Sequence, residues 1–220
     1  MREPYIEGKM KRLGIMAYGS LIDNPGKEIK AATVDRIEDV KTPFKVEFAR
    51  SSITHGGAPT LVPVEKGGAS VNAQVFVLKE GISEKDAMDM LWRREMHKVG
   101  SGETYKRPAK PNENTVLVEH LEDFCEIGVV FYTKIGANIK PLTPRRLAEL
   151  AVESARSEAD AKGLDGISYL VSAKRNGIAT PLMLKYEEEI LKRVGAGSLE
   201  EASSILHFER LKKEGKIHRA

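Results

Sequence analysis

The chain has 220 residues, 41% of them hydrophobic and 30% charged, which is ordinary for a globular protein and long enough for one large domain or a domain with an appendage. A formal net charge of +3 is too small to indicate nucleic acid as a partner. The single cysteine excludes an intramolecular disulfide, and without an evident signal peptide or membrane-spanning apolar run we expect a cytoplasmic protein with no membrane partner.

Up to about residue 139 the apolar segments are short and rich in valine and phenylalanine, and several alternate in the manner of strands. We expect strands at residues 13–18, 44–49, 60–65, 70–78, 114–121 and 126–133. Cys125 lies in EDFCEIGVVFY, inside an expected strand, and its neighbours Asp123 and Glu126 are acidic. Because a thiol nucleophile needs a base or a positive charge nearby, we interpret Cys125 as a small core residue.

Helices interrupt and then follow the strands. Residues 83–99 are expected to form one, with Ser83 as N-cap, acidic residues in the first turn and cations towards the end. After Pro141 the pattern becomes helical over residues 143–163, with Thr143 as cap and Pro144 at the first position. Three more helices are expected at residues 165–177, 185–195 and 198–216. This order of elements predicts an α+β fold.

The stretch LGIMAYGSLIDNPG, residues 13–26, leads from the first strand into a loop. Glycine permits close approach and unusual dihedral angles, and successive N–H groups in such a turn form a concave anion site. With the Ser20 hydroxyl as a further donor, the loop of Tyr18, Gly19, Ser20 and Leu21 predicts a carboxylate or phosphate pocket at the end of the strand. The alternative is a tight turn with Tyr18 packed in the core.

The helix expected at residues 83–99 carries a glutamate, Glu95, four residues after Leu91, on the stripe that faces inward. A carboxylate on an apolar face is partly desolvated, and desolvation raises the pKa of such a group towards the range that general acid–base catalysis uses. Alternatively, Glu95 lies on a solvated face and pairs with a neighbouring cation, Arg93, Arg94 or Lys98.

Taken in order, these features resemble the γ-glutamylcyclotransferase-like family. The resemblance rests on YGSL after an N-terminal strand, then GGAPTLVPVEKGGASVNAQVFVL, a helix with LxxxE, and TYKR, and it covers Leu13 to about Tyr132. It implies a small mixed β-barrel with helices packed around it and a site at the barrel mouth. Residues 1–140 would form this barrel domain, and residues 141–220 a helical C-terminal extension packed on it.

The resemblance also implies an activity and its residues. Backbone groups of the 18–21 loop would bind the α-carboxylate of a γ-glutamyl group, Glu95 would be the catalytic residue, and Tyr105 would be a pocket tyrosine. The substrate's α-amine would attack its own γ-carbonyl and form 5-oxoproline, while Glu95 takes a proton and returns it to the leaving amine. No metal or cofactor is required, and the partner is a small γ-glutamyl molecule. The protein is expected to be a monomer or a homodimer.

Other residues carry open alternatives. In the segment FARSSITHGG, Arg50, Ser52 and His55 are candidates for contacts with the leaving group, although a histidine in a glycine-rich turn is often exposed and idle. Trp92 is either core or pocket wall. The helix that carries Tyr169 packs on the barrel, or else it closes over the pocket and supplies a cation from the group Lys174, Arg175 and Asn176.

Two classes of function remain open. The first is an enzyme that cyclises a γ-glutamyl amide or peptide. The second is a binding module that holds a small acid, or a protein partner through the helical tail, without turnover. The five histidines show no metal-ligand spacing, and neither a Walker loop nor a GxSxG nucleophile elbow occurs.

Overall fold

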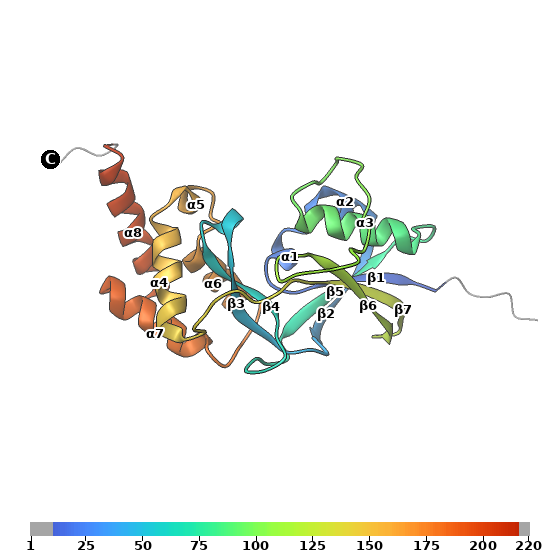
Figure 1. Ribbon diagram of the computed structural model, residues 1–220, viewed down its shortest axis with the longest axis horizontal. Helices are drawn as coiled ribbons and strands as arrows, with labels where there is room; N and C mark the ends of the chain where they lie inside the picture. The colour runs from blue at the N-terminus through green and yellow to red at the C-terminus, as the bar shows by residue number, and fades with distance from the viewer. Residues whose placement is uncertain (1–10, 216–220) are drawn as a thin grey trace, which may run out of the picture.

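Seven strands form a five-stranded mixed sheet and a separate two-stranded ribbon in the computed structural model, which describes residues 11–215 (Figure 1). The strands are β1 (Leu13–Ala17), β2 (Thr33–Lys41), β3 (Val46–Ser52), β4 (Ala58–Pro63), β5 (Asn72–Leu78), β6 (Leu117–Phe124) and β7 (Ile127–Lys134). The sheet has the order β2-β5-β1-β7-β6, in which β1 and β7 are parallel and the other neighbours antiparallel. All six expected strands are confirmed, and β2 was not expected.

Among residues 11–215 the strands do not close into a barrel, so the α+β class is confirmed and the barrel is not. The reason lies in the pairing, because β3 and β4 pair with each other and, in the part of the chain that the structure describes, a single isolated bridge, Val46 to Ala69, joins β3 to the chain before β5. The buried cluster on one face of the five-stranded sheet comes from strands alone and includes Met16, Val75 and Val130, and Tyr18, Phe44 and further strand residues pack against it.

Helix α3 (Glu84–Glu95) covers the other face of the sheet, where Ala87 and Leu91 are fully buried. Ser83 is its N-cap as expected, since its hydroxyl accepts a hydrogen bond from the Asp86 N–H. The helix ends at Glu95, four residues earlier than expected. The shorter helices before it are α1 (Ser20–Asp23) and α2 (Gly26–Ala32).

The early end of α3 is a Schellman motif. The Lys98 N–H donates to the Arg93 carbonyl at 2.7 Å, and the His97 N–H donates to the Arg94 carbonyl at 3.3 Å. His97 has a φ of +55° and occupies the position where helices usually carry glycine. The motif places Glu95 in the last turn of the helix and turns the chain back at His97.

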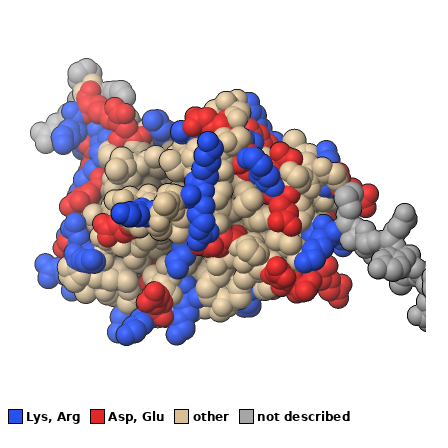
Figure 2. All heavy atoms as spheres, turned by 45° about the vertical axis from the view of Figure 1, so that its right-hand side comes forward, with Lys and Arg blue, Asp and Glu red and all other residues tan. Residues whose placement is uncertain are grey.

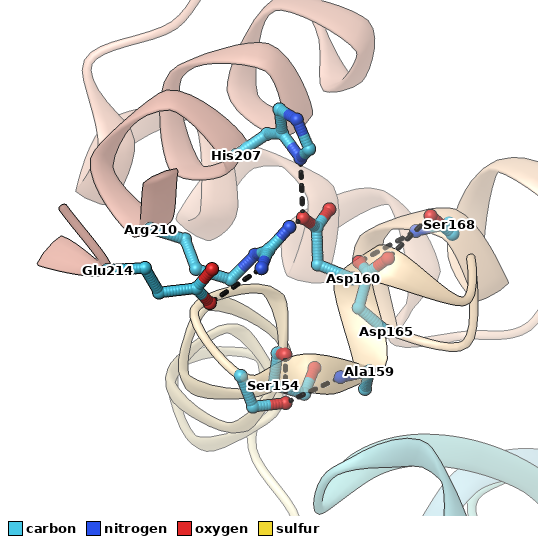
Figure 3. A network of polar contacts seen from close by, with 9 residues as sticks. Ser154, Ala159, Asp160, Asp165, Ser168, His207, Arg210 and Glu214 are labelled. Atoms are coloured by element: carbon cyan, nitrogen blue, oxygen red, sulfur yellow. Dashed lines mark hydrogen bonds and ion pairs between the residues drawn. The ribbon is translucent and has the colours of Figure 1, made fainter. Parts of the chain in front are cut away.

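The C-terminal part is helical, as expected, and packs on the β3–β4 ribbon, which lies between the sheet and these helices (Figure 1). Its helices are α4 (Pro144–Ala155), α5 (Glu158–Ala161), α6 (Gly166–Arg175), α7 (Met183–Val194) and α8 (Leu199–Lys213). The single helix expected at residues 143–163 is wrong. It breaks after Arg156 because Ser157 starts a new one, its hydroxyl accepting a hydrogen bond from Ala159 N–H. Asp160 then ties α5 to α8, with one oxygen 2.7 Å from His207 Nδ1 and 3.1 Å from Arg210 Nε (Figure 3).

One apolar core continues across residue 140, so the boundary between the two expected domains stays a prediction. Phe48 on β3 packs edge-on against Tyr186 on α7, with ring centroids 5.4 Å apart. Beside it the fully buried Glu47 carboxylate accepts hydrogen bonds from the Thr180 hydroxyl at 2.5 Å and the Leu182 N–H at 3.1 Å. Burial raises the pKa of Glu47, and these hydrogen bonds offset only part of that rise.

Two expectations about the surface can be compared with the structure. Cys125 is not a core residue: it is partly exposed in the turn between β6 and β7, where its φ is +51°. On the face drawn in Figure 2, basic and acidic side chains are interspersed without a large area of one sign. No helix between residues 11 and 215 has the length and apolar character to cross a membrane.

Candidate active site

A cavity of about 140 Å³ lies where β1 ends, between the sheet, the β3–β4 ribbon, the end of α3 and α6. Strand β1 delivers Tyr18 to its wall, α1 begins there, and the last residue of α3 faces it. Six of the eight predicted site residues line it: Tyr18, Ser20, Leu21, Arg50, Ser52 and Glu95. The structure therefore brings together a loop and a helix that the sequence separates by more than seventy residues.

Gly19 shapes the loop at the cavity. Its φ of +62° and ψ of −138° lie in a region that residues with a side chain rarely adopt. A Cβ atom at this position would lie 2.6 Å from the hydroxyl of Tyr169. Both the backbone conformation and the space therefore require glycine here. Within residues 11–215, the N–H group of Leu21 has no hydrogen-bond acceptor, which leaves a donor at the start of α1 for a ligand.

Arg94 joins Glu95 to this loop. Its Nη1 lies 2.7 Å from Glu95 Oε1, its Nη2 donates to the Ser20 hydroxyl at 3.2 Å, and its Nε donates to the Asn24 carbonyl at 3.0 Å. The Glu95 side chain is 24% exposed and lines the cavity. Glu95 therefore faces the cavity and is largely buried rather than on a solvated face, and of the second alternative only the pairing with Arg94 is found.

His55 and Tyr169 form another wall of the cavity. Their rings meet edge to face, with centroids 5.7 Å apart, and His55 Nδ1 lies 3.1 Å from the Ser52 hydroxyl. Burial lowers the pKa of His55, and the nearby His97 and Arg94 lower it further, so the His55 ring is neutral at pH 7. Burial raises the pKa of Tyr169 to about 12, although backbone hydrogen bonds from Leu61 and Ser20 oppose the rise. The Tyr169 phenol therefore keeps its proton at neutral pH.

Tyr18 is both a packing residue and a wall of the cavity. Its hydroxyl donates to the Thr133 carbonyl at 2.7 Å, and its ring meets Phe44 edge-on at 5.6 Å. Burial, followed by the charge of Glu95, raises the pKa of Tyr18. The hydroxyl is thus held by β7 and remains protonated.

Tyr105 does not line the cavity, so its expected role as a pocket tyrosine is wrong. Its N–H donates to the buried Asp89 carboxylate at 2.6 Å, and its hydroxyl accepts from the Val118 N–H at 3.2 Å. Its ring lies beside Trp92, which is packed against the core and is likewise not part of the cavity wall. The Asp89 carboxylate on α3 therefore holds the backbone at Tyr105 against this helix and away from the cavity wall.

Arg50 lines the cavity but its guanidinium is already engaged. It donates to the carbonyls of Gly136 at 2.9 Å and Glu113 at 3.1 Å, and to the Asn114 side chain at 3.0 Å. These bonds fasten two connecting segments beside the site. The Arg50 guanidinium therefore holds these segments in place, and the Ser52 hydroxyl contacts His55 in the cavity wall.

Sequence reasoning missed Arg94 and His97 as site residues, and it considered that the Tyr169 helix either packs on the barrel or closes over the pocket and supplies a cation, without naming Tyr169 itself as a site residue. Lys174 pairs with Glu187 at 2.6 Å, and Arg175 pairs with Asp23 at 3.0 Å, so neither cation lines this cavity. The signal for Arg94 was its position next to Glu95. Within residues 11–215 no three His, Cys, Asp or Glu residues converge in a metal-binding arrangement.

No family model matches the chain, and neither does any curated protein. The resemblance to γ-glutamylcyclotransferase-like proteins therefore stays a prediction from the residues themselves.

Proposed function

We propose that this protein cyclises a γ-glutamyl amide or peptide to 5-oxoproline and releases the amine. The observation that carries the proposal is the meeting of Glu95, Arg94 and the Ser20 loop in one cavity. The cavity lies where β1 ends, which corresponds to the position that the family resemblance implies for the site.

The charges of the site complement an α-amino acid. Every γ-glutamyl group carries an α-ammonium and an α-carboxylate on the same carbon, and Arg94 and Glu95 present the opposite charges side by side. The carboxylate would bind to the Arg94 guanidinium, the Ser20 hydroxyl and the Leu21 N–H, while the ammonium would bind to Glu95. Binding exchanges one ion pair within the protein for two with the substrate, which limits the cost of desolvating the pair.

The reaction then needs one proton shuttle. Glu95 takes a proton from the α-ammonium, and the freed amine nitrogen attacks the γ-carbonyl carbon and forms the new C–N bond. The Tyr169 phenol, which is protonated at neutral pH and lines the cavity, would donate a hydrogen bond to the developing oxyanion. The bond to the leaving nitrogen breaks as Glu95 gives it this proton, and the new ring nitrogen loses its second proton through Glu95 to the released amine. Because both reacting groups belong to one molecule, holding the folded conformer contributes about 7–11 kcal/mol.

The test is incubation of the purified protein with a panel of γ-glutamyl amides and dipeptides, with 5-oxoproline detected by mass. A heat-denatured sample serves as the control for spontaneous cyclisation. Formation of 5-oxoproline only with the folded protein is the expected result. No product across a broad panel, with binding of the same compounds seen by calorimetry, would contradict the proposal and favour the binding module.

A further inference from the structure

A second cavity, of about 540 Å³, adjoins the candidate active site. Its walls come from α1, α6 and the start of α8, so it belongs largely to the C-terminal helices. Three residues, Ser20, His55 and Tyr169, line both cavities. The two cavities therefore meet at these three residues.

The second cavity combines an apolar wall with hydroxyl groups. The apolar part comes from Ile167, Val171 and Leu199, and hydroxyl groups line the rest, those of Ser168, Ser172 and Ser203 among them. Such a surface packs against methylene groups along its length and offers hydrogen bonds at its edges. At about 140 Å³, the first cavity is much smaller and lies at the reacting groups.

The charges of the second cavity leave it negative. Asp23 accepts hydrogen bonds from Ser172, Arg175 and Asn176, and although burial opposes it, these contacts lower the pKa of Asp23. The Asp23 charge thus neutralises that of Arg175. Glu200 is the remaining ionised residue of the wall, and its own N–H and the Ser198 hydroxyl lower its pKa. A cation at the far end of a bound molecule would meet this carboxylate.

We propose that the second cavity is the leaving-group subsite and that it takes an extended alkyl arm ending in an ammonium group. The inference rests on the proposed function and adds the class of leaving amine, a diamine rather than a short amine or an amino acid. The arm would run from the γ-carbonyl past His55 along Val171 to Glu200.

The experiment compares γ-glutamyl amides of one length with different ends. The amides of 1,4-diaminobutane, butylamine and 4-aminobutanoate end in a cation, a neutral group and an anion, and the methylamide has no arm to place. The wild-type protein is expected to give the highest kcat/KM with the diaminobutane amide and the lowest with the 4-aminobutanoate amide.

Two variants test the place of the arm. Ser203→Trp fills the second cavity, and Ser204→Trp is its control, since Ser204 is exposed on the same helix and does not line the cavity. We expect Ser203→Trp to lower the ratio of kcat/KM for the diaminobutane amide over the methylamide at least about tenfold, the size of effect that a filled pocket produces. Ser204→Trp leaves that ratio as in the wild type.

The second variant, Glu200→Gln, changes an exposed side chain and keeps the proposal testable if Ser203→Trp fails to fold. It should reduce the preference for diaminobutane over butylamine by about two- to fivefold, as expected for one exposed ion pair. Glu188→Gln on α7 is the control, because Glu188 is exposed and outside both cavities. Equal ratios in Glu200→Gln and the wild type, with the methylamide still cyclised, would overturn the subsite and leave the proposed function standing. No 5-oxoproline from any amide would overturn both.

Discussion

Replacement of Gly19 by alanine tests whether the loop and α6 meet as described. The φ of +62° and ψ of −138° would strain an alanine, and the new Cβ would lie 2.6 Å from the Tyr169 hydroxyl. The strained backbone costs about 1–3 kcal/mol. Moving the hydroxyl away also leaves the Leu61 N–H, now 3.3 Å from it, without its acceptor, at a further ~1–3 kcal/mol.

The expected loss in the free energy of unfolding is therefore about 2–6 kcal/mol. Gly67→Ala is the matched control, since Gly67 has a φ of +76° but no atom lies within 4 Å of the place that an added Cβ would occupy. We expect it to cost only the backbone strain, about 1–2 kcal/mol. Both values are measured by urea unfolding followed by circular dichroism.

A double-mutant cycle with Tyr169→Phe isolates the contact. Without the hydroxyl, Gly19→Ala should cost only its backbone strain, so the two substitutions should couple by about 1–3 kcal/mol. A Gly19→Ala cost no larger than that of Gly67→Ala, or the same cost in both Tyr169 backgrounds, would refute the contact between the loop and α6.

Three further predictions concern stability. His97→Gly should stabilise the protein by about 1 kcal/mol in urea unfolding, because glycine adopts the positive φ at the end of α3 without strain, and a destabilised variant would contradict the Schellman motif. Glu47→Gln should destabilise by about 1–3 kcal/mol, since an amide NH₂ must then face the Leu182 N–H or the Thr180 and Phe48 donors; a neutral effect in the same assay would argue against this buried network. The lowered pKa of His55 means that the unfolded chain binds more protons below the ordinary value of 6.5, so stability should fall as the pH drops below that value. Unfolding of the wild type and His55→Gln at pH 5 to 8 checks this, and equal pH slopes would contradict it.

Much of the fold could be predicted because its elements carry strong local signals. Ser83 and Thr143 cap their helices as expected, and the apolar strands β1 and β5 are buried. Strand β2 was missed because it lies at a sheet edge and most of its residues are charged or exposed, so no apolar alternation marks it. The closed barrel was not found because β3 and β4 pair with each other rather than with the sheet.

The candidate site likewise combines residues that local sequence features predict with residues that only tertiary packing brings together. The Ser20 loop and Glu95 could be predicted because each is a local feature, a glycine turn after a strand and a carboxylate on a helix. Tyr169 comes from a helix about 150 residues after the loop, and only tertiary packing places its hydroxyl beside Gly19. Tyr105 was misplaced because sequence order cannot show that Asp89 holds its backbone outside the cavity.

The most direct measurement of the central claim is the rate at which Glu95→Gln forms 5-oxoproline under saturating γ-glutamyl substrate. Glu84→Gln is the control, because Glu84 is exposed at the opposite end of the same helix. The account predicts that kcat falls about 10²- to 10⁴-fold in Glu95→Gln alone, with an unchanged unfolding transition, since the variant loses the proton shuttle and keeps the fold. A Glu95→Gln rate equal to that of the wild type would contradict the account.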